Sequence, residues 1–328
     1  MNSIRVAVVG LGKMGLVHAT ILNSMPNVEI VGICEKSHLL LKIVKSLFKK
    51  AKTVDDLSKL ADLNLDSVYV TTPIPTHYPI IKEIFSQHIV NNVFVEKTLS
   101  SDFEKSTELF KLVENVNGVN MVGYMKRFAV TFAKAKQILA EKTLGGVVSF
   151  DAYAYSSDFS DVSASSSRSG SRGGALSDLG SHIIDLAQWF FGDLQVASAS
   201  MKSLTGGLWE DEADFVTLAS GLKGNFHVSW CKDEYRMPSF GFKIMGDKGL
   251  MEVDDYCVKL NLKNLEHKVW FKHDLNDHVA FLLGESEYYR EDETFIHSTI
   301  AREKPEPSFK TASGVENVID HVNKEALT

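Results

Sequence analysis

The chain has 328 residues, of which 44% are apolar and 23% charged, and its formal net charge is −7. These values are typical of a globular protein that is long enough for two domains. The negative charge argues against a surface for nucleic acid or for an anionic membrane, and no apolar run reaches the roughly 20 residues of a membrane span. Three isolated cysteines offer neither a disulfide framework nor the spacing of metal ligands, so we expect a cytoplasmic protein without a metal site.

Strand-like and helix-like segments alternate over the first 125 residues, and the chain enters the first strand at once, so we expect no signal peptide. Unbroken apolar strands such as VYV and VFV favour a parallel sheet that is covered on both faces. The expected strands are Ile4–Val9, Val28–Cys34, Ser67–Thr71, Asn92–Val95 and Val119–Tyr124. The expected helices are Met14–Ser24, His38–Lys49, Asp55–Ala61, His77–Gln87 and Asp102–Asn115. We therefore predict an α/β Rossmann domain over residues 1–124.

The remainder, residues 125–328, has a different pattern. Helices are expected at Val130–Glu141, Asp178–Phe191 and Ala312–Ala326. Between the last two lie long segments with a period of two, among them ADFVTLAS, KGNFHVSWC, FGFKIMG and CVKLNL. This period predicts an antiparallel sheet with one polar face. We predict an α+β domain with a large, mostly antiparallel open sheet.

The sequence VAVVGLGKMG contains a G-x-G-x-x-G fingerprint directly after a strand and at the start of a helix. The glycines allow a tight turn, a close approach to pyrophosphate and close helix–strand packing, and the helix N-terminus favours phosphate. An acidic residue that holds ribose hydroxyls is expected about 20 residues further on, at the end of the second strand. The predicted cofactor-binding residues here are Gly10, Gly12, Lys13, Met14, Gly15 and Glu35.

The same acidic residue bears on the choice of cofactor. Glu35 would repel a 2′-phosphate, which favours NAD. Lys36 and Ser37 follow it directly, however, and could accept that phosphate if Glu35 swings out, so NADP stays possible.

Charged and polar residues follow two strands at the edge where open α/β sheets bind ligands. The strand VFV ends in Glu96 and Lys97, and VTTPIPTH places Thr72, Pro73 and His77 at the same edge. The charged pair could equally be a solvated strand end, and His77 could be a histidine at a helix N-terminus without a role. We assign Glu96, Thr72, Pro73 and His77 to the cofactor site.

The segment RGGALSDLGSHIIDLAQWFFG carries the strongest chemical pattern of the second domain. Asp178 and His182 are four residues apart, and Asp185 follows on the same helix face. A carboxylate aligned with an imidazole fixes its tautomer and raises its basicity, as an acid–base catalyst requires. On spacing alone, Ser177 or Asp178 could instead cap the helix while His182 packs inside.

The chain resembles the glucose–fructose oxidoreductase / inositol dehydrogenase (Gfo/Idh/MocA) family of nicotinamide-dependent enzymes. The resemblance runs from VAVVGLGKMGLVHA through TTPIPTH, VFVEKTLS and VGYMKRF to GGALSDLGSHIIDLAQWFFG and GFKIMGDKGLMEVDD. It implies an NAD(P)-dependent oxidoreductase that transfers hydride between the nicotinamide and a secondary alcohol or ketone of a sugar, cyclitol or sugar derivative.

The resemblance also implies roles for individual residues. Lys97 matches the family lysine that contacts cofactor and substrate hydroxyl, and His182 matches the proton acceptor. Asp178 binds substrate hydroxyls or assists the histidine, and Met125 and Lys126 approach the same pocket. Chemically, hydride transfer from an alcohol requires removal of its hydroxyl proton, and a fixed cation stabilises the developing alkoxide.

Two positions depart from the family pattern. Thr98 follows Lys97 where the family usually has proline, often after a cis bond. Because a cis bond before a non-proline residue costs about 2.5–4 kcal/mol, we predict a trans Lys97–Thr98 bond. Ile74 occupies a position where the family often has asparagine near the cofactor.

The serine-rich run Ser156–Ser171 lacks a hydrophobic pattern and is either a mobile surface loop or a lid over substrate, with Arg168 and Arg172 available for an anionic group.

The sheet of the second domain is expected to form a homodimer or homotetramer, because one of its faces carries large apolar residues; the domain's own helices could cover that face instead. The residues of this face are Phe215, Phe226, Val228, Phe242 and Ile244.

Two other functions stay open. One is a dinucleotide-binding sensor without turnover, for which Thr98 is a mild hint and the retained Lys97, Asp178 and His182 are counter-evidence. The other is a reductase of a non-carbohydrate substrate; family members of that kind often lack the aspartate–histidine pair.

Overall fold

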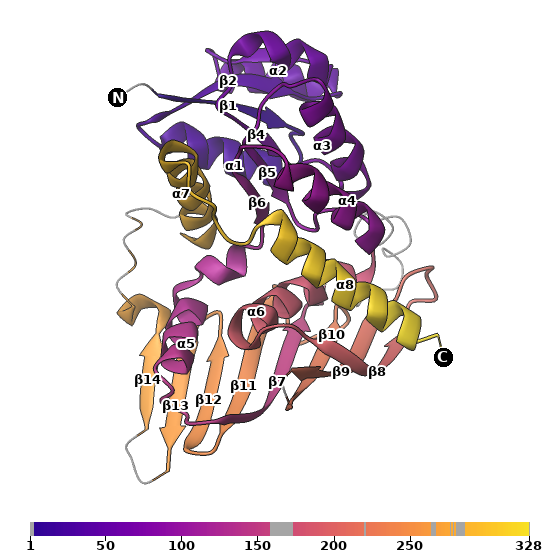
Figure 1. The fold of residues 1–328 in the computed structure, drawn as a ribbon, viewed down its shortest axis with the longest axis vertical. Coiled ribbons are helices and arrows are strands. Elements are labelled where there is room, and N and C mark those ends of the chain that lie inside the picture. Colours follow the sequence, from indigo (N-terminus) through magenta and orange to yellow (C-terminus); the bar gives the residue numbers. More distant parts are fainter. Residues whose placement is uncertain are drawn as a thin grey trace. The chain divides into compact units, whose positions relative to one another are not determined.

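Two β-sheets organise the chain, and each is the centre of one unit (Figure 1). Unit 1 comprises Met1–Met125 and Val279–Ser313, and unit 2 comprises Lys126–His278 and Gly314–Thr328. The structure is a computed structural model that describes residues 3–157, 173–219, 221–263, 267–275, 277, 279 and 286–327.

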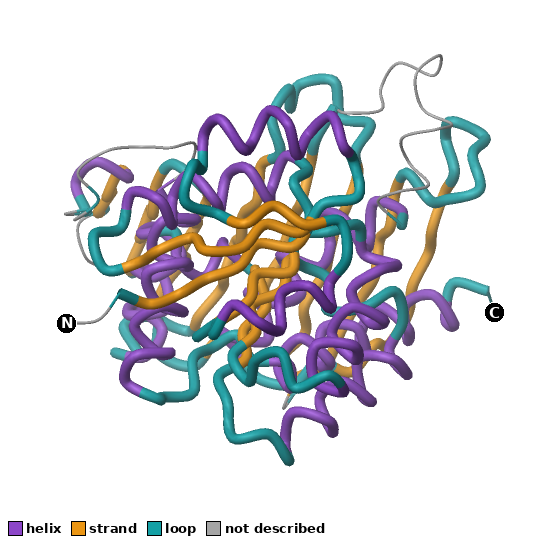
Figure 2. The backbone as a smooth tube through the Cα atoms, turned by 90° about the horizontal axis from the view of Figure 1, so that it is seen from above, coloured by secondary structure: helices purple, strands orange, loops and turns teal. Residues whose placement is uncertain are grey.

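The sheet of unit 1 has six parallel strands in the order β3-β2-β1-β4-β5-β6. This is the strand order of a doubly wound dinucleotide-binding fold, and Figure 2 shows the strands with helices on either side. The strands are β1 Ile4–Val9, β2 Val28–Cys34, β3 Lys52–Val54, β4 Ser67–Val70, β5 Val93–Glu96 and β6 Asn120–Gly123. The predicted Rossmann fold is confirmed, and only the three-residue strand β3 was not foreseen.

The helices of unit 1 follow the predicted segments closely, except that the sequence did not predict the one near the C-terminus. They are α1 Lys13–Ser24, α2 His38–Leu47, α3 His77–Ser86, α4 Phe103–Glu114 and, near the C-terminus, α7 Ser286–Ala301. The segment expected at Asp55–Ala61 is a 3₁₀ helix, Leu57–Leu63. Side chains cap two of the helices, since Ser37 accepts from the amide of Leu40 and Asp102 accepts from that of Lys105.

A segment from the C-terminal part completes unit 1, whereas the sequence predicted that all of 125–328 forms the second domain. The backbone amide of Val122 in β6 donates to the carbonyl of Pro307 at 2.9 Å, and α7 packs on α1. The aromatic ring of Phe295 lies 5.3 Å from Tyr69 and 5.7 Å from Phe94, which are in the central strands. These contacts connect residues that are far apart in sequence, which local patterns do not report.

The sheet of unit 2 has eight strands in the order β14-β13-β12-β11-β7-β10-β9-β8. All neighbouring pairs are antiparallel except β7 and β10, which confirms the predicted mostly antiparallel sheet. The strands are β7 Val147–Tyr155, β8 Gln195–Lys202, β9 Glu212–Ala219, β10 Leu222–Ser229, β11 Ser239–Gly246, β12 Gly249–Asp254, β13 Cys257–Leu262 and β14 Lys268–Phe271.

Helices α5 Val130–Ala140 and α6 Ser181–Phe191 cover one face of this sheet (Figure 1). The sequence predicted an oligomer because one face of this sheet is apolar, and that face is the one that α5 and α6 cover. Phe190 packs on Phe242 and Phe191 stacks on Phe150, with ring centroids 5.3 and 4.4 Å apart. The five apolar residues of that face are all buried inside the unit, so the argument that they form a dimer interface was wrong: Phe215, Phe226, Val228, Phe242 and Ile244.

The last helix, α8 Phe309–Glu325, has residues in both units. In the described ranges no helix is long and apolar enough to cross a membrane. The predicted lid, Ser156–Ser171 with Arg168 and Arg172, falls largely on residues 158–172, which lie outside the described residues.

Candidate active site

The glycine fingerprint forms the turn between β1 and α1. Gly10 has φ +91°, and a Cβ atom there would lie 2.6 Å from Cγ2 of Thr72. A Cβ on Gly15 would lie 2.0 Å from the carbonyl oxygen of Gly10, so only glycine permits this contact between helix and strand. Gly12 has open space instead, with no atom within 4 Å of a Cβ position. Two glycines thus build the turn, and the third leaves room above it.

The open position is the N-terminus of α1. Gly12 is the N-cap, no side chain accepts from the first amides of the helix, and Lys13 is exposed. Free amides, a positive helix end and an absent side chain form the cradle that a pyrophosphate requires. These residues fit a dinucleotide.

Glu35 lies at the carboxyl end of β2, where the fingerprint predicted it. The amide of Leu11 donates to Oε2 at 2.7 Å, and the amide of Ser37 donates to Oε1 at 2.9 Å. The carboxylate is thereby fixed beside the glycine turn. Each oxygen keeps a further lone pair with which it can accept from a ribose hydroxyl.

His77 connects two strand ends. Its Nε2 atom lies 2.7 Å from the carbonyl oxygen of Thr72, and its Nδ1 atom lies 2.8 Å from that of Thr98. Burial lowers the pKa of His77, although hydrogen bonds to both carbonyls oppose the shift. The ring is fully buried, so its contribution to a cofactor site is indirect: it lies between the carbonyls of Thr72 and Thr98, and a neutral ring donates to one of them.

The Lys97–Thr98 peptide bond is cis, so the predicted trans bond was wrong. The prediction considered only the local preference of the peptide bond. In the fold, Thr98 is buried, its hydroxyl donates to the carbonyl of Ser100 at 2.9 Å, and its own carbonyl faces His77. Tertiary contacts therefore determine the backbone here.

Glu96 is turned inward from the end of β5. Its Oε1 atom lies 2.9 Å from Nε2 of His18, and its Oε2 atom accepts from the amide of Lys97 at 3.1 Å. On the other side of the ring, Nδ1 of His18 lies 2.8 Å from Oδ1 of Asp292 in α7. The two charged residues at the end of β5 therefore differ in environment: Glu96 belongs to a buried network, while Lys97 is half-buried.

In unit 2, Lys126 and His182 lie around one aromatic ring. Nζ of Lys126 is 5.0 Å from the centroid of Phe240, and the ring of His182 is 5.1 Å from the same centroid. Lys126 is 2% exposed and forms an ion pair with Asp255 at 2.7 Å, which also accepts from the amide of Phe240. Asp255, which lies in the turn after β12, was missed because nothing in that turn marks it as the partner of a residue so far away.

Asp178 lies on a π-helical turn, Leu176–Gly180, directly before α6, and not on the α-helix that the sequence predicted there. At the start of this turn the amide of Leu176 donates to Oε1 of Glu210 at 2.9 Å. Burial raises the pKa of Glu210, even though this hydrogen bond opposes it. Because a π turn has more residues than an α turn, spacing of four residues does not by itself align Asp178 with His182.

Asp185 is engaged elsewhere. Arg127 donates to both of its carboxylate oxygens, from Nε and from Nη2, each at 2.7 Å. Both side chains are buried, and the guanidinium lies 5.7 Å from the ring of Trp189. This forked pair fixes α6 to the segment before α5, so Asp185 is a structural residue of the helix that carries His182.

Two residues of the first site were missed. His18 is on the inner face of α1, one turn after Gly15, and a histidine among buried apolar positions is the signal that could have found it. Asp292 carries no such signal, because its partners are in strands and helices at the other end of the chain.

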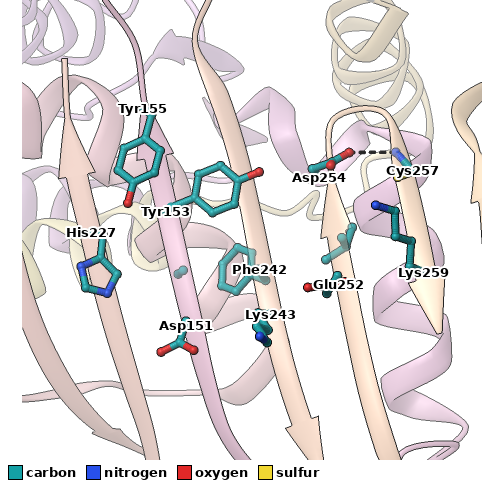
Figure 3. A pocket seen from close by; sticks show the side chains of 12 residues that line it. Asp151, Tyr153, Tyr155, His227, Phe242, Lys243, Glu252, Asp254, Cys257 and Lys259 are labelled. Carbon is teal, nitrogen blue, oxygen red and sulfur yellow. Dashed lines mark hydrogen bonds between the residues drawn. The ribbon is translucent and has the colours of Figure 1, made fainter. Parts of the chain in front are cut away.

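The face of the second sheet opposite α5 and α6 is polar and has a hollow of about 330 Å³ (Figure 3). Tyr153 and Tyr155 of β7 stack there with ring centroids 5.1 Å apart. Across the strands, Asp151 pairs in register with Lys243, then Glu252, then Lys259. Charges of opposite sign thus alternate along this row.

Comparison with known proteins identifies both parts of the chain. Residues 4–124 match the model of an oxidoreductase family with an NAD-binding Rossmann fold. Residues 132–252 match the model of the GFO/IDH/MocA C-terminal domain. The two matches together cover most of the chain.

Related sequences and structures agree with these matches. The chain is 24% identical to scyllo-inositol 2-dehydrogenase (NAD(+)) of Bacillus subtilis (strain 168), over 70% of this chain and 68% of that protein. It is 23% identical to inositol 2-dehydrogenase of Rhizobium meliloti (strain 1021), over 77% of this chain and 76% of that protein. A structure of levoglucosan dehydrogenase in complex with NADH superimposes with a TM-score of 0.90 at 18% identity, covering 99% of this chain and 97% of that one. At this identity the superposition shows a common fold.

Proposed function

Since the chain belongs to the GFO/IDH/MocA family of NAD-dependent oxidoreductases, we propose that it transfers hydride between NAD and a secondary alcohol or ketone of a sugar, cyclitol or sugar derivative. The observation that carries this proposal is the strand end Glu96-Lys97 at the same edge of the parallel sheet as a glycine turn that fits a dinucleotide. The names of the relatives, inositol dehydrogenases and a levoglucosan dehydrogenase, support a polyol or sugar as the substrate.

NAD, when bound, supplies the hydride acceptor or donor. The amides at the N-terminus of α1 hold its pyrophosphate, and Glu35 accepts from its ribose hydroxyls. The two backbone hydrogen bonds that fix Glu35 favour NAD over NADP, because they keep a negative charge where a 2′-phosphate would lie. Ser37 is occupied as the cap of α2, which further supports NAD.

In the proposed chemistry Lys97 stabilises the alkoxide that develops when the substrate hydroxyl loses its proton. His182 accepts that proton during oxidation and returns it during reduction, and Asp178 binds substrate hydroxyls or assists the histidine. Lys126 contributes to substrate binding from beside the same Phe240 ring as His182. These roles rest on the family resemblance together with the burial of His182 and Lys126.

The test is nicotinamide oxidation and reduction over a panel of sugars, inositols and uronic acids with NAD and NADP, comparing the wild type with Lys97→Ala. We expect turnover with NAD, and a loss of about 10²–10³-fold in the variant, the range for removal of one stabilising charge or donor. NADH affinity, measured by fluorescence on the same samples, should change much less. NADH binding without turnover of any panel member would overturn the proposal and favour a sensor.

We also propose a homodimer through the polar face of the second sheet, opposite the helices. The row Asp151, Lys243, Glu252, Lys259 has alternating charge, and the same row read in reverse places an opposite charge at each position. A twofold axis through its centre would therefore form four complementary pairs, as an isologous interface requires. Light scattering of the wild type beside Lys243→Glu should show a dimer that dissociates in the variant; an unchanged mass in the variant would exclude this interface.

The three cysteines support a reducing compartment such as the cytoplasm, since Cys34, Cys231 and Cys257 are all free thiols.

A further inference from the structure

A buried charged network lies beneath the proposed catalytic lysine, and the proposed chemistry does not use it. His18 from α1 is fully buried between Glu96 of β5 and Asp292 of α7. Both ring nitrogens are within 3 Å of a carboxylate oxygen, at 2.9 Å and 2.8 Å. Only a doubly protonated imidazole donates to both sides at once.

The surroundings explain how a charged ring persists in the interior. Burial by itself disfavours the imidazolium, but the charge of Asp292 and the hydrogen bonds to Asp292 and Glu96 outweigh it, so the pKa of His18 is raised well above its ordinary value. Tyr69, Phe94 and Tyr288 surround the ring, with centroid distances of 5.7, 5.0 and 6.1 Å. The ring therefore has one orientation, fixed on every side.

Glu96 transmits that orientation to the next residue. One carboxylate oxygen faces His18, and the other accepts from the backbone amide of Lys97. Gly123 of β6 leaves room for this carboxylate, since a Cβ atom there would lie 3.3 Å from Oε2 of Glu96. If His18 no longer holds Oε1, the carboxylate is free to rotate, and the amide of Lys97 loses a fixed acceptor.

We infer that His18 is a positioning residue for Lys97, which it holds through the carboxylate of Glu96, while Asp292 orients the ring from the opposite side. The inference rests on the proposed function in giving Lys97 its role, but the network itself is independent of that role. It also assigns a purpose to the return of α7 to unit 1: this helix supplies the partner without which the imidazolium would face a single carboxylate.

Two substitutions of the same residue separate the two sides of the ring. In His18→Gln the side-chain amide nitrogen lies near the former Nε2 and keeps the donor to Glu96, whereas in His18→Asn it lies near the former Nδ1 and keeps the donor to Asp292. Both remove the charge and the aromatic ring. A difference between them therefore reports which hydrogen bond positions Lys97.

The first readout is the reactivity of the Lys97 amine, measured by competitive acylation at several pH values and mass spectrometry, which needs neither cofactor nor turnover. We expect His18→Asn to change the acylation rate at Lys97 by at least about threefold, the effect of half a pKa unit on the free amine, while His18→Gln stays close to the wild type. Lys13, in the same unit and exposed, is the internal reference lysine. With a substrate in hand, kcat should fall about 10²-fold in His18→Asn, the effect of a misplacement near 1 Å, with NADH affinity changed much less.

Equal reactivity of Lys97 in the wild type and in both variants would overturn the inference, as would an equal effect of the two variants. If the variants at position 18 do not fold, Glu96→Gln and Asp292→Asn replace them. The amide of Glu96→Gln cannot accept on both sides, so Lys97 should respond, whereas Asp292→Asn leaves the contact of His18 with Glu96 in place and should leave Lys97 nearly unchanged. Loss of the expected Lys97 response would contradict the positioning role, whereas absence of turnover in the wild type would contradict only the proposed function.

Discussion

The two places that carry the proposed chemistry are built in different ways. At the end of β5, the carboxylate of Glu96 contacts a buried histidine and accepts from the backbone amide of Lys97. At the start of α6, Asp178 lies on a π turn, and the nearby Asp185 is committed to Arg127. The position of a strand end in a parallel sheet is fixed by the neighbouring strands. The environment of a residue on a helix depends instead on which face of the helix packs against the rest of the domain.

This difference shows that the spacing of residues in the sequence predicts the position of a site residue better in unit 1 than in unit 2. In unit 1 the carboxyl ends of parallel strands meet at one edge, so a motif at a strand end is already located. In unit 2 the spacing placed Asp185 on the same helix face as His182 but did not show that it is half of a buried ion pair with Arg127.

Breaking that ion pair should have the largest effect. Arg127→Met leaves the buried carboxylate of Asp185 without its partner, and such a loss costs about 3–5 kcal/mol of unfolding free energy. All four tryptophans are in unit 2, at positions 189, 209, 230 and 270, so urea unfolding followed by tryptophan fluorescence reports on this unit.

The matched control is Arg236→Met, which removes an exposed arginine and should stay within about 0.5 kcal/mol. A double variant, Arg127→Met with Asp185→Leu, should regain much of the loss because it replaces the pair by apolar groups of similar size. A small effect of Arg127→Met would mean that this ion pair does not hold α6 in place.

The Rossmann fold could be predicted almost completely, because hydrophobic runs, glycines and helix caps are local signals. VAVVGLGKMG and VEIVGICE located the turn, Glu35 and two strands, and the structure agrees with each. The alternation of ADFVTLAS and its successors likewise predicted the second sheet.

The predictions that were wrong or missing concern residues whose partners are remote in sequence. The apolar face containing Phe242 was expected at an interface, but the period of two cannot tell whether helices of the same domain cover that face. The cis bond before Thr98 follows from contacts that include His77. Asp292 joins the first unit from the far end of the chain, and no spacing rule connects it with His18.

The preference for NADH over NADPH tests the role of Glu35, whose position the spacing of the glycine fingerprint predicted. Glu35→Gln removes the charge that excludes a 2′-phosphate, so we expect the preference for NADH over NADPH, measured as a ratio of dissociation constants, to fall about tenfold, the effect of a charge-assisted hydrogen bond. Glu29→Gln, in the strand that leads to Glu35, is the control, since Glu29 lies near Arg5 and away from the glycine turn. An unchanged ratio in Glu35→Gln would remove Glu35 from cofactor selection.

The smallest expected effect is the pH dependence of stability that arises from the network of His18, Glu96 and Asp292, which the sequence did not predict. The folded pKa of His18 is raised above its unfolded value of about 6.5, so the folded state binds the extra proton. Its contribution to stability is therefore complete below that value and is lost as pH rises through the raised pKa of the folded state. Facing groups on other elements are Glu96, Asp292, Tyr69 and Tyr288, and burial raises the pKa of Asp292 as well, although His18 opposes it.

Both shifts act in one direction, because a buried carboxyl with a raised pKa also loses stability as pH rises above its ordinary range. Calorimetry should therefore show the melting temperature of the wild type declining from neutral pH upward, and the decline should be shallower in His18→Gln, which has no proton to lose at this position. The comparison of slopes, rather than of absolute stabilities, isolates the network from the general effect of the substitution. Parallel slopes in the two proteins would mean that the ring of His18 is neutral and that the folded state takes up no extra proton there.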